Sequence, residues 1–205
     1  GGVDIPIRIY TPEKHSENKQ PVFYYIHGGG FAAGSMDVVE EMCKLVVEKT
    51  GCVSVSVGYR LAPEHPFPAG LDDCYAVLAW ICENAGTFGG DGARICIAGD
   101  SAGGNLAAVC AMKDRDAGTH MVKAQALLYP TVNMAGVEDD DYHFSEDIFE
   151  IAPEHAALLA PMTSLLKSAS GAGGLFTDPA ATETYAPYLP AALANRDGLP
   201  PCIIL

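Results

Sequence analysis

Positive charge is scarce in this sequence, and the scarcity limits the partners that the protein can have. Lys and Arg together number 12 against 26 Asp and Glu, which gives a formal net charge of −14. A field of this sign repels nucleic-acid phosphates and anionic lipid headgroups. We therefore expect no nucleic acid and no membrane among the partners.

Targeting signals and cysteine pairs are missing as well. The sequence contains no signal peptide and no apolar run long enough to cross a bilayer. Its seven cysteines are an odd number and show no C-x-x-C spacing, which argues against a zinc site or a disulfide framework. Reduced thiols in apolar stretches favour a cytoplasmic protein. The cysteines are Cys43, Cys52, Cys74, Cys82, Cys96, Cys110 and Cys202.

The length and composition are those of one globular domain. The chain has 205 residues, of which 49% are hydrophobic. Alternating apolar residues predict a half-exposed strand at 3–10, at the edge of a sheet because of Pro6. Continuous apolar content predicts buried strands at 22–26, 52–57 and 124–129. An amphipathic helix is predicted at residues 71–80, so strands and helices alternate and the fold class is α/β.

A further helix is predicted between the strands at 22–26 and 52–57. Ser35 or Asp37 is expected to cap it, and it is expected to end near Gly51. Its apolar stripe is predicted from the helical spacing of Val38, Met42, Leu45 and Val46. A strand, helix and strand in this order predict parallel pairing of the two strands.

The most informative stretch is the one around Ser101. Residues 95–98 form a short apolar run typical of a covered parallel strand, and helical spacing begins at Asn105. Between them lies G-x-S-x-G, in which Gly99 and Gly103 lack the Cβ atoms that would collide with the neighbouring strand and helix. This pattern predicts that Ser101 is a nucleophile held on a sharp turn.

The alternative for this stretch is a phosphate loop. Gly99 and Gly104 have the G-x-x-x-x-G spacing and precede a helix. Asn105 and Leu106 stand where Lys and Ser or Thr are required, which argues against a phosphate loop.

The second motif is His27-Gly28-Gly29-Gly30, directly after the strand at 22–26. Three glycines leave backbone N–H groups unobstructed, and two such groups aimed at one point can stabilise the oxyanion of an acyl-transfer intermediate. The alternatives are a plain flexible loop and a dinucleotide loop. The dinucleotide loop is disfavoured, because no acidic residue that could bind a ribose follows the strand at 52–57.

Three motifs in order carry a resemblance to a known family: HGGG at 27–30, YRLAPEHPFPA at 59–69 and GDSAGG at 99–104. With them the sequence resembles the hormone-sensitive-lipase-like carboxylesterases of the α/β-hydrolase superfamily. The resemblance implies an α/β-hydrolase fold with a mostly parallel sheet flanked by helices. It also implies that a small carboxylic ester with a short or medium acyl chain is hydrolysed through a serine acyl-enzyme, without metal or cofactor. A homo-oligomer is left open.

The same resemblance assigns roles to single residues. Ser101 would be the nucleophile, and the N–H groups of Gly29, Gly30 and Ala102 would form the oxyanion hole. His27 would brace the glycine loop and not act as the base. Supporting positions of the two motifs are His27, Gly28 and Asp100.

The resemblance also implies a domain organisation. We expect an α/β-hydrolase core at residues 1–131, a helical lid insertion at 132–198 and the start of a further core strand at 199–205. In this family the triad aspartate follows the strand that matches residues 200–205, and the catalytic histidine comes later. We therefore expect both beyond Leu205, and expect this chain to be the N-terminal part of an esterase that is nearly inert alone.

None of the histidines in the chain is a convincing replacement for that base; they are His15, His27, His65, His120, His143 and His155. His65, between two prolines, is expected to have a structural hydrogen-bonding role. Two alternatives to an esterase stay open at this point. One is a non-catalytic protein that binds a small ligand on the same fold, and the other is an amide or peptide hydrolase.

Overall fold

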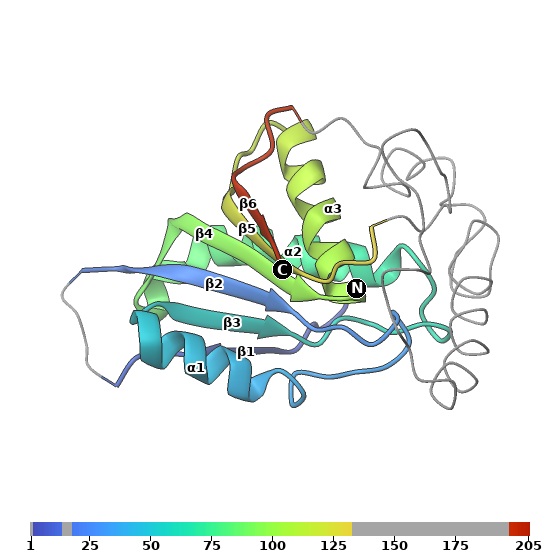
Figure 1. Ribbon diagram of the computed structural model, residues 1–205, viewed down its shortest axis with the longest axis horizontal. Helices are drawn as coiled ribbons and strands as arrows, with labels where there is room; N and C mark the ends of the chain where they lie inside the picture. The colour runs from blue at the N-terminus through green and yellow to red at the C-terminus, as the bar shows by residue number, and fades with distance from the viewer. Residues whose placement is uncertain (1, 14–17, 133–196) are drawn as a thin grey trace.

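The computed structural model describes residues 2–13, 18–132 and 197–205, which form a six-stranded sheet with helices packed on it (Figure 1). The strand order is β1-β3-β2-β4-β5-β6, in which β1 is antiparallel to β3 and the other pairs are parallel. The strands are β1 (Ile7–Tyr10), β2 (Gln20–Ile26), β3 (Val53–Val57), β4 (Gly90–Asp100), β5 (Val122–Leu128) and β6 (Cys202–Ile204). The helices are α1 (Glu40–Thr50), α2 (Ala69–Asn84), α3 (Ala102–Asp116) and the short 3₁₀ helix η1 (Ala85–Phe88).

This arrangement follows the predicted α/β pattern. The crossover from β2 through α1 to β3 gives parallel strands, as the order of elements predicts. β1 lies at the sheet edge, and it begins at Ile7, later than the predicted residue 3, directly after Pro6. Because proline cannot donate a ladder hydrogen bond, Pro6 delays the strand.

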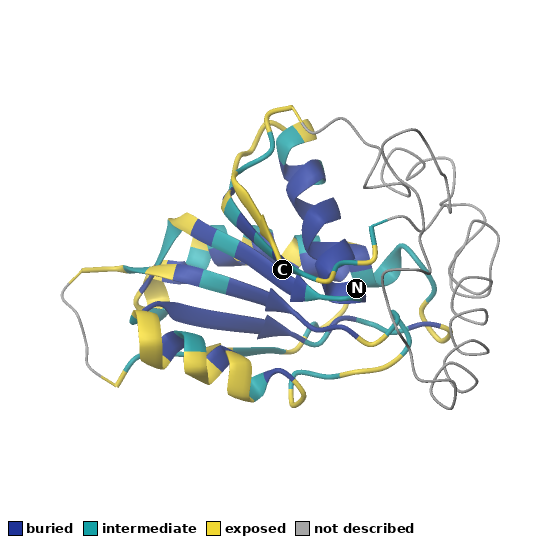
Figure 2. Cartoon of the chain, in the orientation of Figure 1, coloured by how far each residue is buried: buried dark blue, intermediate teal, exposed yellow. Residues whose placement is uncertain are grey.

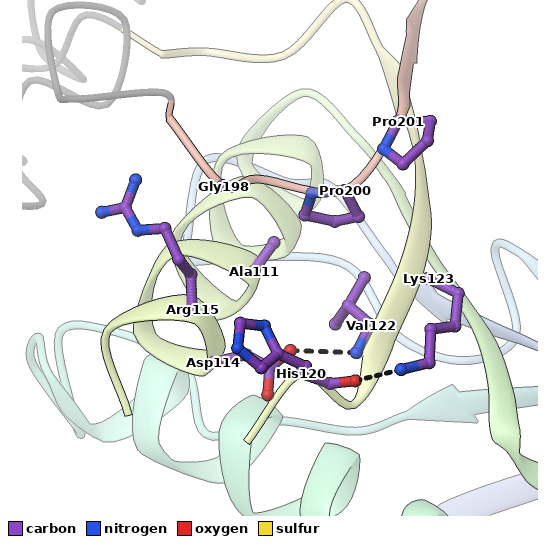
Figure 3. Close-up of a pocket in the computed structure, with 9 residues that line it drawn as sticks. All are labelled: Ala111, Asp114, Arg115, His120, Val122, Lys123, Gly198, Pro200 and Pro201. Atoms are coloured by element: carbon purple, nitrogen blue, oxygen red, sulfur yellow. Dashed lines mark hydrogen bonds between the residues drawn. The ribbon is translucent and has the colours of Figure 1, made fainter. Parts of the chain in front are cut away.

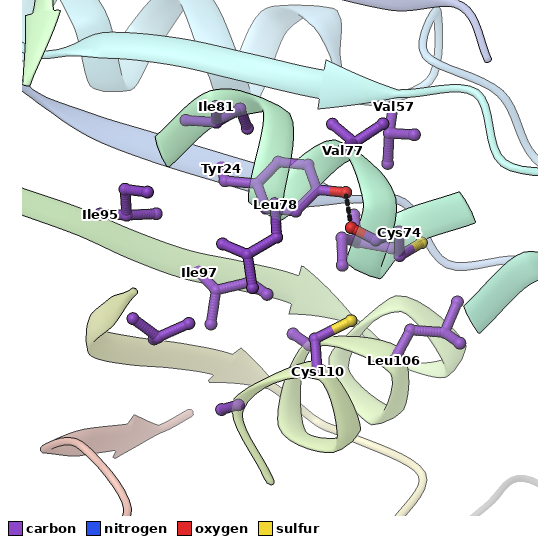
Figure 4. Close-up of a cluster of buried hydrophobic side chains, with 14 of the residues drawn as sticks. Tyr24, Val57, Cys74, Val77, Leu78, Ile81, Ile95, Ile97, Leu106 and Cys110 are labelled. Carbon is purple, nitrogen blue, oxygen red and sulfur yellow. Dashed lines mark hydrogen bonds between the residues drawn. The ribbon is translucent and has the colours of Figure 1, made fainter. Parts of the chain in front are cut away.

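The face of the sheet beneath α2 and α3 carries the main apolar core (Figure 4). Alternate residues of β2, which include Tyr24 and Ile26, pack there with Ile97 of β4 and Leu78 of α2, all at 0% exposure. Tyr24 keeps its hydroxyl satisfied by donating to the Cys74 carbonyl oxygen at 3.0 Å. Side-chain burial of this kind stabilises a fold in proportion to the apolar area removed from water.

The opposite face is covered by α1, and here the predicted apolar stripe is wrong. Val38, Met42 and Leu45 are 72%, 39% and 49% exposed and Val46 is half-buried, while Cys43 and Val47 are buried. Much of α1 is exposed (Figure 2). The helix begins at Glu40 after Val39 and has no side-chain cap; Ser35 Oγ instead accepts from the Asp37 N–H at 3.2 Å. Packing on the sheet buries the i, i+4 series 39, 43 and 47 instead.

The register of the central strands brings two predicted motifs to one edge. Ile26 at the end of β2 pairs with Gly99 near the end of β4, and Asp100 pairs with Leu128 at the end of β5. The segments after β2 and β4 therefore leave the sheet side by side at its carboxyl edge, which is where open α/β sheets hold their sites.

Of the other predicted segments, most of the lid at 132–198 lies outside the described residues. β6 lies within the strand expected at 199–205 and pairs with β5. None of the helices in the described ranges is both long and apolar enough to span a membrane.

Candidate active site

Ser101 lies on the sharp turn between β4 and α3. Its backbone adopts φ 50° and ψ −116°, a conformation that an L-residue with a side chain rarely takes. The turn is held from the neighbouring segment, since Ser101 N–H donates to the Leu128 carbonyl at 2.9 Å and Thr131 N–H donates to the Ser101 carbonyl at 3.2 Å. The residue is half-buried on this strained turn.

Two glycines make the turn sterically possible. A Cβ on Gly103 would collide with the Ile26 carbonyl oxygen and lie 2.6 Å from that of His27. A Cβ on Gly99 would collide with the backbone of Gly103 and lie 2.7 Å from the Ile26 carbonyl oxygen. The start of α3 thus packs backbone to backbone against the ends of β4 and β2, as the G-x-S-x-G spacing predicts.

The glycine loop after β2 has the backbone that only glycine adopts easily. Gly29 and Gly30 have φ values of 124° and 62°. The N–H groups of Ala32 and Ala33 both donate to the Gly29 carbonyl, at 3.2 and 2.9 Å, which closes the loop on itself. Ala62 N–H donates to the Phe31 carbonyl at 2.9 Å and ties the loop to the second motif at 59–69.

His27 is buried at the base of this loop, with 2% exposure. Its Nδ1 lies 2.8 Å from the Gly28 carbonyl oxygen, and because a carbonyl only accepts, the hydrogen resides on Nδ1. The ring stacks on Tyr59 with centroids 4.4 Å apart, and the Tyr59 hydroxyl donates to the His27 carbonyl at 2.9 Å. Burial lowers the pKa of His27, so the imidazole stays neutral here.

Asp100 joins the two motifs. Its Oδ1 accepts from the Gly28 N–H at 3.0 Å and from the Tyr25 hydroxyl at 3.1 Å. Tyr25 does not stand out in the sequence, because an aromatic residue in a buried strand is typical of a core. The available signal was its position, one residue after Tyr24, which turns its hydroxyl to the other face of the sheet.

A second contact missed by the sequence analysis anchors the loop at 59–69. Arg60 makes a bidentate pair with Asp73 of α2, with Nε to Oδ2 at 2.9 Å and Nη2 to Oδ1 at 2.7 Å. The Arg60 N–H also donates to Asp73 Oδ2 at 2.9 Å, and the Asp73 side chain is only 3% exposed. Bidentate geometry makes this pair directional as well as strong.

The remaining histidines are exposed or lie outside the described residues. His65 and His120 are exposed, and His120 precedes β5 at the far end of that strand from Ser101. His65 is held through its backbone, whose N–H donates to the Leu61 carbonyl at 2.9 Å. The others, His15, His143 and His155, fall outside the described residues.

A hollow of about 260 Å³ lies at the other end of α3 and β5 (Figure 3). Asp114, Arg115, His120 and Lys123 are among the residues that line it. The buried Asp114 carboxylate is satisfied there by the Thr119 hydroxyl and the N–H groups of residues 121 and 122. The hollow faces the amino end of β5, so it is separate from the Ser101 turn. Over the described ranges no cluster of three or more His, Cys, Asp or Glu could hold a metal.

A strained serine after a parallel strand, next to a glycine loop from the adjacent strand, defines the class of α/β-hydrolase proteins. A family model for the alpha/beta hydrolase fold matches residues 23–205, and the chain belongs to this family. The predicted fold class is therefore confirmed, and so is the resemblance to hormone-sensitive-lipase-like esterases, since relatives with such names match as well.

Among curated relatives, carboxylesterase NlhH of Mycobacterium tuberculosis is 48% identical over 131 residues, which cover 64% of this chain and 41% of the relative. Arylacetamide deacetylase of Bos taurus is 40% identical over 136 residues, covering 63% of this chain and 34% of the relative. An esterase structure from Pyrobaculum calidifontis matches with a TM-score of 0.80 and 36% identity, covering 98% of this chain and 61% of that one. The chain thus spans about two fifths or less of the length of these two curated relatives.

Proposed function

We propose that the protein is a serine hydrolase of small carboxylic esters with short or medium acyl chains. The observation that carries the proposal is the pairing of Ile26 with Gly99. This pairing brings the strained turn at Ser101 next to the glycine loop, whose N–H groups would bind the oxyanion. Relatives and structural neighbours named carboxylesterase or esterase support the same activity.

In the proposed reaction, Ser101 Oγ attacks the ester carbonyl carbon and the carbonyl oxygen takes up negative charge. The N–H groups of Gly29, Gly30 and Ala102 donate to that oxyanion. Ala102 is the first residue of α3, so the positive end of the helix dipole adds to the stabilisation. Collapse of the intermediate expels the alcohol and leaves the acyl group on Oγ, and water then releases the acid.

The Ser101 proton requires a base, and we propose that a residue outside the described ranges supplies it. His27 is committed to the Gly28 carbonyl and stacked on Tyr59, which suits a brace of the loop and not a proton acceptor. His27, Gly28 and Asp100 therefore support the loop in this proposal, and no metal or cofactor takes part.

The test is hydrolysis of p-nitrophenyl acetate, butyrate and palmitate, together with covalent labelling by a fluorophosphonate, in the protein expressed from its complete coding sequence. Ser101→Ala is expected to lower kcat by about 10⁶ and to abolish labelling. Ser54→Ala, which removes the hydroxyl of a buried serine on β3, is the matched control and is expected to leave both unchanged.

The two alternatives are distinguished in the same assay. Unchanged turnover in Ser101→Ala would overturn the assignment of the nucleophile. Tight binding of a small apolar ligand by a protein without any turnover would indicate a ligand-binding role. Cleavage of anilides as fast as the matching esters would indicate an amide hydrolase.

We also propose a reducing compartment such as the cytoplasm. The cysteines in the described residues are free, and Cys43, Cys74 and Cys110 are fully buried. Burial raises the pKa of each of these thiols, so they are protonated and unreactive at neutral pH. Thiol alkylation of freshly lysed cells is expected to find all of these cysteines reduced.

A further inference from the structure

The oxyanion loop and the serine turn belong to different strands, so their separation has to be set by contacts between them. Backbone packing at Gly103 fixes the start of α3 against the end of β2. The loop itself, from Gly28 onward, is tied to the serine turn by a side chain. That side chain is Asp100, the residue directly before Ser101, whose Oδ1 accepts from the Gly28 N–H at 3.0 Å.

Gly28 also lies close to Asp100 at its Cα. A Cβ on Gly28 would collide with Asp100 Oδ2 and lie 2.8 Å from the Asp100 carbonyl oxygen. The glycine backbone is therefore pressed directly onto Asp100. Any movement of this carboxylate moves the first glycine of the loop, and with it the donors that follow.

The carboxylate is held in turn by Tyr25. The hydroxyl donates to Asp100 Oδ1 at 3.1 Å, and the ring is 3% exposed and lies 5.7 Å from the ring of Phe23. Burial and, next, the charge of Asp100 raise the pKa of Tyr25, so it remains a neutral phenol that donates. Because β2 carries both Tyr25 and the glycine loop, the hydroxyl is a fixed point relative to the loop.

We propose that Asp100 is a positioning residue that sets the distance between the oxyanion donors and Ser101, and that Tyr25 fixes Asp100 in this role. The inference rests on the proposed ester hydrolysis for its effect on catalysis. The inferred position of the loop does not depend on that activity, and it can be tested by itself. Neither side chain is required to touch the substrate.

The first test compares Tyr25→Phe with Tyr24→Phe in the protein expressed from its complete coding sequence. Both changes remove one buried hydroxyl from adjacent positions of β2, but Tyr24 donates to the Cys74 carbonyl of α2 and not to Asp100. Tyr25→Phe is expected to lower kcat about tenfold with little change in KM, because the oxyanion donors matter most in the transition state. Tyr24→Phe is expected to keep kcat. Equal kcat in the two variants would overturn the proposal.

The second test asks whether geometry or charge is required. Asp100→Ala removes both acceptors and is expected to lower kcat about 100-fold through a loop displaced by about 1 Å. Asp100→Asn keeps an oxygen that can accept from Gly28 and Tyr25, and is expected to recover most of that loss. An Asp100→Asn variant as slow as Asp100→Ala would show that the charge, and not the position, is needed.

Hydrogen exchange read by mass spectrometry supplies a readout that does not depend on activity. Peptides covering residues 27–34 are expected to exchange faster in Tyr25→Phe than in Tyr24→Phe. If the wild-type protein hydrolyses no ester and this difference is present, the proposed function fails and the positioning role survives. If turnover is present and the loop exchanges equally in both variants, the positioning role fails.

Discussion

The carboxyl edge of the sheet and the core beneath α2 and α3 are built from different kinds of contact. The core is a cluster of large side chains, such as Tyr24, Leu78 and Ile97, each with 0% exposure. At the edge, Gly99 and Gly103 lie directly against neighbouring backbones, and Gly28 lies against the side chain and carbonyl oxygen of Asp100.

This difference determines where the chain tolerates substitution. Side chains in a core can shift and repack, so a substitution there is absorbed in part. Backbone segments in direct contact cannot shift without moving whole strands. Three of the four non-glycine residues with positive φ in the described ranges lie at this edge, where Phe31, Ser101 and Tyr129 have φ values of 65°, 50° and 36°; the fourth is His120, at the other end of β5. Strain of this kind persists only where the surroundings enforce it.

The largest effect is expected from Gly103→Ala. The new Cβ would meet the Ile26 and His27 carbonyl oxygens, so we expect a loss of about 4 kcal/mol or more of stability and loss of activity. The measurement is urea unfolding together with esterase turnover.

Gly86→Ala is the control for Gly103→Ala. A Cβ at Gly86 meets only the flexible end of Lys19, so stability is expected to stay unchanged or rise by up to about 1 kcal/mol. Equal stability of the two variants would show that the close backbone contacts of Gly103 do not restrict that position.

The core counterpart is Leu78→Ala. A fully buried leucine lost from the α2 face is expected to cost about 3 kcal/mol of unfolding free energy, measured by urea denaturation. Because Leu78 lies in the apolar cluster and not at the carboxyl edge, kcat per folded molecule is expected to stay at the wild-type value. A large fall in kcat at full folding would mean that core packing also sets the geometry of the site.

A smaller effect is expected on α1, where burial should set the stability cost of a substitution as it does in the core. Val47→Ala, at 7% exposure, is expected to cost about 2 kcal/mol in urea unfolding. Leu45→Ala, at 49% exposure, is expected to change stability by less than about 0.5 kcal/mol. The reverse order would restore the apolar stripe predicted from sequence.

These regions also differ in how far the sequence predicts them. The strand, turn and helix around Ser101 and the loop after His27 are local patterns in which glycines stand at fixed offsets, so they were predictable. The contacts of Asp100 with Tyr25 and of Arg60 with Asp73 were not, because they join residues 75 and 13 positions apart through the sheet register and the packing of α2. The orientation of α1 was missed because Met42 and Leu45 fit a helical stripe as well as Cys43 and Val47 do, and only packing decides between them.

His27 belongs to both regions, since it is buried like the core but lies at the base of the glycine loop, with Nδ1 2.8 Å from the Gly28 carbonyl oxygen. Burial lowers its pKa below the ordinary value of 6.5, so as the pH falls below about 6.5 the unfolded chain takes up a proton before the folded protein does. The stability that neutral His27 contributes is therefore complete above pH 6.5 and is lost from there down toward its folded pKa.

His27→Asn keeps a donor where Nδ1 stands but does not titrate, so it is expected to lose less stability than the wild type between pH 7.5 and 5.0. The exposed His65, changed to Asn, is the control, and urea unfolding at the two pH values measures the difference. If the wild type and His27→Asn lose the same stability, the buried histidine is not a source of acid sensitivity.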